Sequence, residues 1–482
     1  MTTQRIGFWL GPALFALALL LPAPAGMEPA AWLVAGLVGW VAAWWITEAL
    51  PLAVTALLPF AVIPLTGVMD AKATASAYYS DIIFLLLGGA FIALAIERTG
   101  LHRRLALFLL AVVGKGGGQF RLLLAFMAAA ALLSMLISNT STALIMMPVA
   151  LAVLAGGGVK DGDIASSSSS EAIGQTEGMS GALPMGIAFA ASIGGLGTLV
   201  GSPTNAIAVG LVDEALGVRI SFFDWSLFGI PVVLIGIPLA AWIIARVQRI
   251  ADHPFDTLAA HAAVDDHRGW SSAEKRLVPV VAATFLMWMG QPLLEPLLPP
   301  GALTEGGVAI VASLALFVLP DGTGRALLNW NEADRAPWGV LLMFGGGLAL
   351  AAGMGASGLA GWIGDQLLFL DAFPLVVIAM VMVALVILIT EFASNVATAS
   401  GFIPVIAALI AALGADPLLL AMPAALAASW GFVLPAGTGP NAIAWSTGRL
   451  ALPRLVRAGL VLDVLGVFLI VGVVFALAPL LG

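Results

Sequence analysis

Residues 134–148 read SMLISNTSTALIMMP, and residues 390–404 read TEFASNVATASGFIP. A hydroxyl residue, a Ser-Asn pair and a proline recur between them at one offset of 256 residues, as Ser134, Ser138, Asn139 and Pro148 in the first stretch and Thr390, Ser394, Asn395 and Pro404 in the second. Each stretch lies in the middle of a long apolar region. The shared order and spacing indicate that the two regions are equivalent parts of an internal repeat.

The composition around these stretches is that of a membrane protein. The chain has 482 residues, of which 61% are hydrophobic and only 10% are charged, whereas soluble proteins carry roughly 25% charged residues. Because such a small number of charges cannot cover a water-facing surface, we expect lipid to surround most of the chain. There is no cysteine, the four histidines lie in polar stretches, and no basic run is present. Disulfides, thiol catalysis, an organic cofactor, a histidine metal cluster and nucleic-acid binding are therefore not expected.

Apolar segments of about 20 residues predict transmembrane helices. Eleven such spans are expected, at residues 7–24, 30–47, 51–68, 81–97, 182–212, 223–246, 277–295, 302–319, 337–356, 418–446 and 457–479. A cleaved signal peptide is the alternative interpretation of the first span. Residues 119–155 and 375–413 are about twice the length of one hairpin arm, with the Ser-Asn pair in the middle. We interpret each as a re-entrant helical hairpin.

The distribution of Lys and Arg gives an orientation. With the N-terminus in the cytoplasm and both hairpins re-entrant, 17 of the 19 Lys and Arg residues fall on the cytoplasmic side, and only Lys72 and Arg219 fall outside. This is the bias that the positive-inside rule predicts. The expected protein lies in the cell (inner) membrane, with its C-terminus outside.

Further matches support two repeats of opposite orientation. Gly88-Gly89 and Thr99-Gly100-Leu101 match Gly346-Gly347 and Ser357-Gly358-Leu359 at an offset of 258, while Asn205 and Asn441 are 236 apart. A Gly- and Ser-rich insertion, residues 156–181, accounts for the change in offset. The expected fold is therefore an all-α polytopic membrane protein with two hairpins in two inverted repeats, which is a transporter architecture with its site at the repeat interface.

The hairpin tips have the chemistry of an ion and anion site. At a tip, the helix that ends offers free carbonyls and the helix that begins offers free N–H groups. Carbonyls with hydroxyls suit a sodium ion, and N–H groups with Asn and Thr side chains suit a carboxylate. Pro and Gly unwind the following spans at residues 194–205 and 434–441. Two tips and two unwound loops predict one pseudo-symmetric site, which suits a dicarboxylate.

No Lys or Arg falls at either tip or in either unwound loop. Helix ends, amides and bound cations would therefore neutralise a doubly charged anion, which makes cation coupling the expectation. An intramembrane enzyme would need a Ser-His or His-Asp constellation within the spans, and the sequence has none. A channel is the remaining alternative, although channels rarely need two ion-binding hairpins.

The same segments resemble the divalent anion/sodium symporter family. The resemblance covers nearly the whole chain and is carried by SNT at 138–140, TEFASN at 390–395, WWITEALPL at 44–52, PWGVLLMFGGGL at 337–348 and the two Pro-Asn loops. It implies an elevator-like carrier that forms a homodimer through its scaffolds. The implied scaffold comprises residues 1–118 and 277–374, the transport domain residues 119–246 and 375–482, and the cytoplasmic connector residues 247–276.

The resemblance also implies site residues. One sodium site would use Ser134, Ser138, Asn139 and the backbone of Gly201, and a second would use Thr390, Ala393, Asn395 and the backbone of Gly437. The substrate carboxylates would meet Ser138, Asn139, Thr140, Ser394, Asn395 and Val396, with Ser202 and Thr438 beside them.

This chain departs from the family pattern at three places. Many bacterial members have Thr-Pro-Pro-Asn in both unwound loops, whereas residues 202–205 read SPTN and residues 438–441 read TGPN. Val396 stands where a second SNT motif would have Thr. A C4-dicarboxylate such as succinate, malate or fumarate, carried by sodium symport, is the first expectation. Citrate, 2-oxoglutarate and sulfate are alternative substrates, and dicarboxylate exchange is the alternative mechanism.

Overall fold

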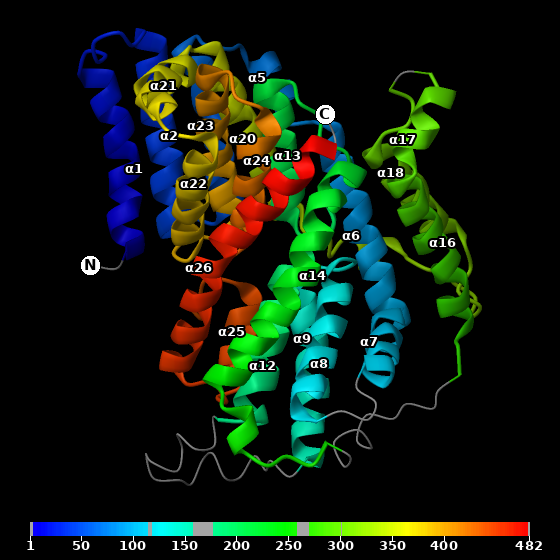
Figure 1. The fold of residues 1–482 in the computed structure, drawn as a ribbon. Coiled ribbons are helices and arrows are strands. Elements are labelled where there is room, and N and C mark those ends of the chain that lie inside the picture. The colour runs from blue at the N-terminus through cyan, green and yellow to red at the C-terminus, as the bar shows by residue number, and fades with distance from the viewer. Residues whose placement is uncertain (1–2, 114–117, 158–176, 258–268, 300, 481–482) are drawn as a thin grey trace.

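The computed structural model describes residues 3–113, 118–157, 177–257, 269–299 and 301–480. Within these ranges the regular structure is helical, and the β-type pairing is one isolated bridge between Pro320 and Ala326. Figure 1 shows the helices running along the long direction of the molecule, as expected for an all-α membrane protein.

The first repeat contains two groups of helices. The first group precedes the hairpin and comprises α1 (Thr3–Leu20), α2 (Pro29–Thr47), α3 (Leu52–Thr55), α4 (Leu58–Thr66), α5 (Ala71–Ala77), α6 (Asp81–Thr99) and α7 (Leu101–Val113). The second group comprises α8 (Gln119–Ser134), α9 (Asn139–Gly156), α12 (Met179–Gly195), α13 (Pro203–Leu216), α14 (Phe222–Val247) and η1 (Ile250–Asp252).

The second repeat has the same two groups. The first comprises α16 (Ser272–Met289), α17 (Gln291–Leu294), η2 (Glu295–Leu297), α18 (Glu305–Val318), α19 (Trp330–Ala333), α20 (Trp338–Ala356), α21 (Leu359–Leu367) and η3 (Leu368–Ala372). The second comprises α22 (Leu375–Thr390), α23 (Asn395–Leu413), α24 (Pro417–Ala427), α25 (Gly439–Ser446), α26 (Leu452–Leu477) and η4 (Ala478–Leu480).

The helix bounds reproduce the repeat read from the sequence. α8 begins and ends 256 residues before α22, and α9 begins 256 residues before α23. The turn that ends α6 and the turn that precedes α21 both contain glycine in the left-handed conformation, with φ of 82° at Gly100 and 78° at Gly358. A residue with a Cβ is strained there, which explains why both repeats have glycine at this position.

The two predicted hairpins are present as pairs of packed helices, α8 with α9 and α22 with α23. Four residues separate the helices of each pair. In Figure 1 the pair α8/α9 occupies the lower half of the molecule and the pair α22/α23 the upper half. This opposite placement matches an inverted repeat, and α12 packs against the first hairpin.

Eight helices among the described residues are long and apolar enough to cross a membrane, or nine if the bent pair α16/α17 is one span. α9 and α23, the second arms of the hairpins, are among these eight. Several predicted spans are instead shorter or broken helices, so the number eleven stays a prediction. The predicted span 51–68 breaks between α3 and α4, because Pro59 has no N–H with which to continue the helix.

Two segments that the apolar pattern left between spans are helical. α7 follows α6 after one residue, and α21 is its counterpart in the second repeat. Both are amphipathic and shorter than a span, so a search for long apolar runs does not find them. Most of the predicted insertion and part of the predicted connector, residues 158–176 and 258–268, lie outside the described residues.

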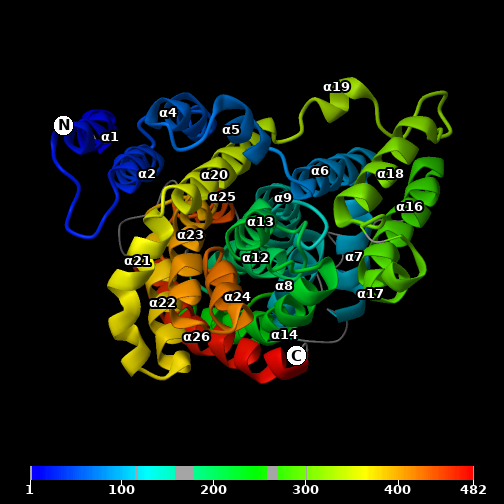
Figure 2. The same ribbon diagram turned by 90° about the horizontal axis from the view of Figure 1, so that it is seen from above.

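The centre of the molecule is α12, in which every residue from Met179 to Gly195 is buried. Seen from above in Figure 2, the hairpins and broken helices gather around α12, while α1, α2, α6, α16, α18 and α20 lie outside this group. This arrangement places both hairpins and both broken spans in one central body. The predicted division into transport and scaffold segments stays a prediction.

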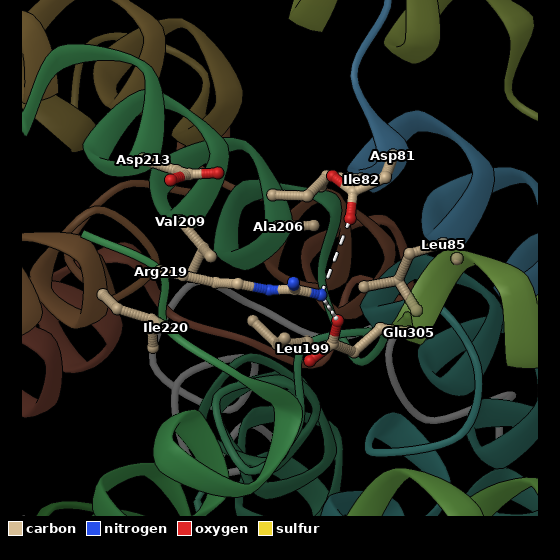
Figure 3. A pocket seen from close by; sticks show the side chains of 11 residues that line it. Asp81, Ile82, Leu85, Leu199, Ala206, Val209, Asp213, Arg219, Ile220 and Glu305 are labelled. Carbon is tan, nitrogen blue, oxygen red and sulfur yellow. Dashed lines mark hydrogen bonds and ion pairs between the residues drawn. The ribbon is translucent and has the colours of Figure 1, made fainter. Parts of the chain in front are cut away.

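An ion-pair cluster joins the central body to the outer helices. The Arg219 guanidinium, between α13 and α14, lies 2.8 Å from Glu305 on α18 and 3.7 Å from Asp81 on α6. Figure 3 shows Arg219 between these two carboxylates. The small cavity beside them holds about 20 Å³, which is too small for a dicarboxylate.

Candidate functional site

A cavity of about 600 Å³ lies where the two repeats meet. Its lining includes the N-terminal residues of four helices: Ser138, Asn139, Thr140 and Ser141 of α9; Ser202, Pro203 and Thr204 of α13; Ser394, Asn395 and Val396 of α23; and Thr438, Gly439 and Pro440 of α25. α9 and α23 begin at the hairpin tips, and α13 and α25 begin after the unwound loops. One cavity therefore receives four helix N-termini, two from each repeat.

Local sequence explains why these helices begin at the cavity. The hydroxyl of Ser138 accepts the N–H of Ser141 at 3.2 Å, and that of Ser394 accepts the N–H of Ala397 at 3.2 Å. Thr438 caps α25 by accepting the N–H of Asn441 at 3.2 Å. These are N-cap bonds, which fix a helix start and still leave its first N–H groups for a ligand.

The first tip has a buried cluster of oxygen atoms. The Ser134 hydroxyl donates to the Ala191 carbonyl at 2.6 Å and lies 2.7 Å from the Asn139 amide. That amide also lies 3.2 Å from the carbonyls of Gly201 and Ala191. With its nitrogen turned towards these oxygens, the Asn139 amide donates hydrogen bonds to them. With its oxygen turned towards them, the Ser134 hydroxyl, the Asn139 amide oxygen and the two carbonyls form a set of oxygen ligands for a cation.

The second tip repeats this arrangement. The Thr390 hydroxyl lies 2.8 Å from the Ala428 carbonyl and 2.9 Å from the Asn395 amide oxygen. Ala428 is the C-cap residue of α24, and Ala191 lies in the last turn of α12. A hydroxyl has one proton, so Thr390 can donate to only one of these oxygens. The same set of hydroxyl, amide and helix-end carbonyl thus occurs at both tips.

The structure brings together most of the predicted site residues. All of the predicted substrate residues line the cavity: Ser138, Asn139, Thr140, Ser202, Ser394, Asn395, Val396 and Thr438. Three residues of the first predicted sodium site, Ser134, Asn139 and Gly201, are in contact. The Ser138 side chain instead caps α9. Gly437 lines the cavity. Ala393 is not part of the cavity lining, and its N–H donates to the Ile389 carbonyl at 3.0 Å.

Asn205 and Asn441 hold the unwound loops from within. The Asn205 amide donates to the carbonyls of Gly195 at 2.7 Å and Thr198 at 2.8 Å, and the Asn441 amide donates to the Leu434 carbonyl at 3.1 Å. Both side chains are fully buried. They satisfy carbonyls that the unwinding frees, so they stabilise the loop shape.

A second link ties each loop to its hairpin tip. In the first repeat the Thr198 hydroxyl donates to the Met135 carbonyl at 2.7 Å. In the second repeat Glu391, which is 256 residues after Met135, accepts the N–H groups of Val433 at 2.9 Å and Leu434 at 2.8 Å. Glu391 is therefore a structural tie, and Asp463 of α26 lies against it.

The sequence did not identify the Ala191 and Ala428 carbonyls or the tie at Thr198. Backbone carbonyls carry no side-chain signal, so a motif search cannot find them. The available signal was the geometry of a broken helix, whose last carbonyls are free and must have partners.

Comparisons with known proteins identify the family of the chain. The family model described as the sodium:sulfate symporter transmembrane region matches residues 5–482. The chain is 38% identical over 486 residues to the sodium-dependent dicarboxylate transporter SdcS of Staphylococcus saprophyticus, covering 99% of this chain and 92% of that protein. It is 36% identical over 489 residues to SdcS of Staphylococcus aureus, with the same coverage.

A solved structure supports the fold. The YdaH transporter of Alcanivorax borkumensis aligns over 100% of this chain and 99% of its own, with a TM-score of 0.55 and 14% identity. At this identity the likeness concerns the fold alone. The family model spans nearly the whole chain, and the apolar helices are those of a multi-pass membrane protein. The chain belongs to the family of the sodium:sulfate symporter transmembrane region, the divalent anion/sodium symporters.

Proposed function

We propose that this protein is a sodium-coupled symporter of a C4-dicarboxylate. The observation that carries the proposal is the set of four helix N-termini at one cavity. Each N-terminus is equivalent to about half a positive charge, so four supply about two, which matches the charge of a dicarboxylate. The relatives named as sodium-dependent dicarboxylate transporters support the same substrate class and coupling ion.

Two sodium ions bind at the hairpin tips in this proposal. At the first tip, Ser134, Asn139 and the carbonyls of Gly201 and Ala191 would hold one ion. At the second tip, Thr390, Asn395 and the Ala428 carbonyl would hold the other. All of these donors are oxygen atoms, as carbonyl-lined sodium sites in transporters require. Each ion would lie beside a helix start that faces the substrate, so ion and anion would stabilise each other's binding.

The transport domain, residues 119–246 and 375–482, moves as an elevator against the scaffold in this proposal. A Cβ at Gly89 of α6 would lie 3.4 Å from Val200 Cβ in the first unwound loop, whereas a Cβ at Gly347 of α20 would lie 3.5 Å from Ser400 Cβ on the second hairpin. Gly89 and Gly347 are repeat equivalents, but their partners are not. Inverted repeats that contact the scaffold differently are what alternating access by domain movement requires.

The test is uptake by purified protein in proteoliposomes. Succinate, malate, fumarate, citrate, 2-oxoglutarate and sulfate would be offered with an inward sodium gradient, with a proton gradient, and with neither. We expect concentrative uptake of a C4-dicarboxylate only with the sodium gradient, into vesicles that contain no substrate. Uptake that is independent of both gradients, or that needs substrate inside, would exclude symport.

Val396 offers a test of the substrate end of the site. Val396→Thr places a hydroxyl at the second helix start, where the first has Thr140. A hydrogen bond to a charged group contributes about 1.5–3 kcal/mol, so we expect the KM for the dicarboxylate to fall by about tenfold. Val340→Thr is the matched control, because Val340 lines the same cavity from α20. An unchanged KM in Val396→Thr would show that this end does not contact a carboxylate.

Glu391 offers a test of the loop tie. Glu391→Gln retains one acceptor oxygen for the two N–H groups of Val433 and Leu434, so one buried donor loses its partner. That loss costs about 1–3 kcal/mol. We expect the half-saturating sodium concentration to rise about tenfold, measured from the sodium dependence of uptake. Glu28→Gln, at an exposed position, is the control. Equal sodium dependence in both variants would show that Glu391 does not support sodium binding.

A further inference from the structure

The large cavity extends from the hairpin tips along one face of α6. Its α6 lining is Leu86, Gly89, Ala90, Ala93, Leu94 and Glu97. This spacing of three and four residues is one helix face, which runs about 16 Å from the middle of α6 to its C-terminal end. α20 contributes only residues at its start, Pro337, Val340 and Leu341. The cavity thus leads to the place where α6 ends and α20 begins.

Two charged side chains stand at that end, Glu97 and Arg335. Among the described residues that line the cavity, Arg335 is the only one with a cationic side chain. It is exposed, and its described polar contact is a long one, from Nε to the Glu332 carbonyl at 3.5 Å. Its charge therefore faces the water of the cavity mouth rather than a carboxylate of the described part of the chain.

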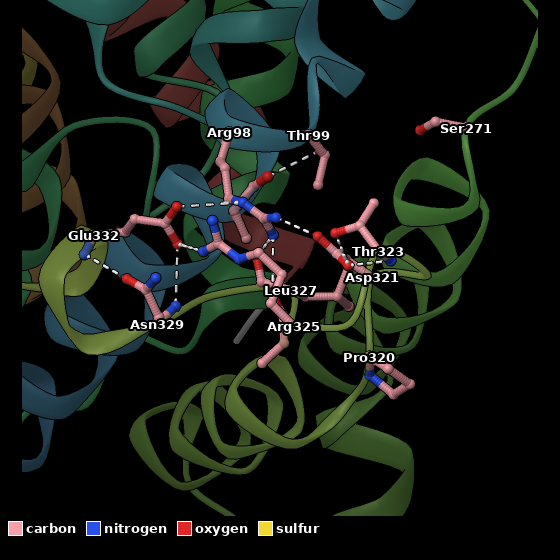
Figure 4. Close-up of polar contacts among 12 residues, drawn as sticks. Arg98, Thr99, Ser271, Pro320, Asp321, Thr323, Arg325, Leu327, Asn329 and Glu332 are labelled. Carbon is pink, nitrogen blue, oxygen red and sulfur yellow. Dashed lines mark hydrogen bonds and ion pairs between the residues drawn. The ribbon is translucent and has the colours of Figure 1, made fainter.

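The neighbouring arginines are neutralised, unlike Arg335. Arg98 pairs with Asp321 and with Glu332 at 3.3 Å, and Arg325 pairs with Glu332 at 2.6 Å. Figure 4 shows these side chains interlocked around Arg98. Hydrogen bonds from the backbone and hydroxyl of Thr323, together with Arg98, hold the pKa of Asp321 below its ordinary value. These ion pairs tie together the loop that leads to Arg335.

We propose that Arg335 is an anion-binding residue at the mouth of the substrate path, which captures the dicarboxylate between the hairpin tips and the aqueous phase on its own side of the membrane. The inference rests on the proposed function and adds a residue that the two Ser-Asn tips do not include. A cation in a cavity with low-dielectric walls raises the local concentration of a divalent anion, and Glu97 opposes it. In the predicted orientation this side is the cytoplasm.

The experiment compares the two faces of the membrane. Initial rates of sodium-driven succinate transport would be measured in right-side-out and in everted membrane vesicles, for wild type, Arg335→Gln, Arg335→Lys and Glu97→Gln. We expect Arg335→Gln to raise the half-saturating succinate concentration about fivefold at the face that carries Arg335, with less than about a twofold change at the other. Arg335→Lys should restore the wild-type value, and Glu97→Gln should lower it.

The effect should also depend on salt, because added choline chloride screens exposed charges. Arg457→Gln is the control, because it removes the same charge from an exposed residue that does not line the cavity. Equal changes at both faces, no change in Arg335→Gln, or the same change in Arg457→Gln would overturn the inference while wild-type uptake upholds the proposed function. Absence of uptake by the wild type would overturn both.

Discussion

Replacing Asn139 by alanine is expected to reduce sodium-driven dicarboxylate uptake at least about a hundredfold. The Asn139 amide is the centre of the first oxygen cluster, 2.7 Å from the Ser134 hydroxyl and 3.2 Å from the carbonyls of Gly201 and Ala191. When the ion is bound, its loss removes one ligand. When the ion is absent, its loss takes a donor from the buried Gly201 carbonyl, at about 1–3 kcal/mol, whereas the Ala191 carbonyl keeps its bond from Ser134. A hundredfold loss of uptake corresponds to about 2.7 kcal/mol. One buried carbonyl that loses its partner can account for a loss of this size.

Asn395→Ala should have an effect of the same order, because Asn395 occupies the same place beside Thr390 at the second tip. The rate of radiolabelled succinate uptake at saturating sodium measures both variants, and size-exclusion chromatography shows that each is folded. Asn331→Ala is the matched control, since Asn331 is exposed on α19 and lies outside the cavity lining. Uptake at the wild-type rate in Asn139→Ala or Asn395→Ala would show that this asparagine is not needed for transport.

The tips could be predicted from sequence because polar residues in apolar segments are conspicuous. Ser134 and Asn139 stand in a region of Ala, Leu, Ile and Met, and their counterparts recur at one offset. The contacts between Ser134 and Asn139 and between Thr390 and Asn395 follow from the turn that separates each pair. The same signal located the unwound loops, since Gly and Pro in mid-span free backbone groups that need partners.

Other parts of the site left no comparable signal. The Ala191 and Ala428 carbonyls act through the backbone, and alanine in a membrane helix is ordinary. Glu391 was visible as a charged residue, but its role depends on two N–H groups 42 and 43 residues away. In the sequence, Arg335 is one of many basic residues in the predicted cytoplasmic loops. Only the cavity lining distinguishes it from the others.

Linking α6 to the first unwound loop is expected to stop transport completely. The two Cβ positions at Gly89 and Val200 are 3.4 Å apart, close to the spacing of about 3.5–4.5 Å in disulfides. The chain contains no cysteine, so Gly89→Cys with Val200→Cys introduces the only thiols. If the transport domain moves past α6, oxidation should abolish uptake and a reductant should restore it. Mass spectrometry of the intact protein measures the fraction cross-linked.

A matched pair within the scaffold makes this result specific. Gly339 of α20 and Ala53 of α3 also have Cβ positions 3.5 Å apart, and both belong to the proposed scaffold. Oxidation of Ala53→Cys with Gly339→Cys should form the same bond without slowing uptake. Gly347→Cys with Ser400→Cys joins α20 to the second hairpin and should arrest transport as the first pair does.

The three pairs together decide between movement of a domain and movement of the tips alone. If only the tips opened and closed, a bond between α20 and Ser400, in the body of the second hairpin, would leave uptake intact, and only the bond at Val200 would stop it. An elevator predicts that both bonds stop it, because α6 and α20 stay with the scaffold while the whole central body moves. Full uptake by quantitatively cross-linked protein at either position would therefore contradict the proposed division into domains.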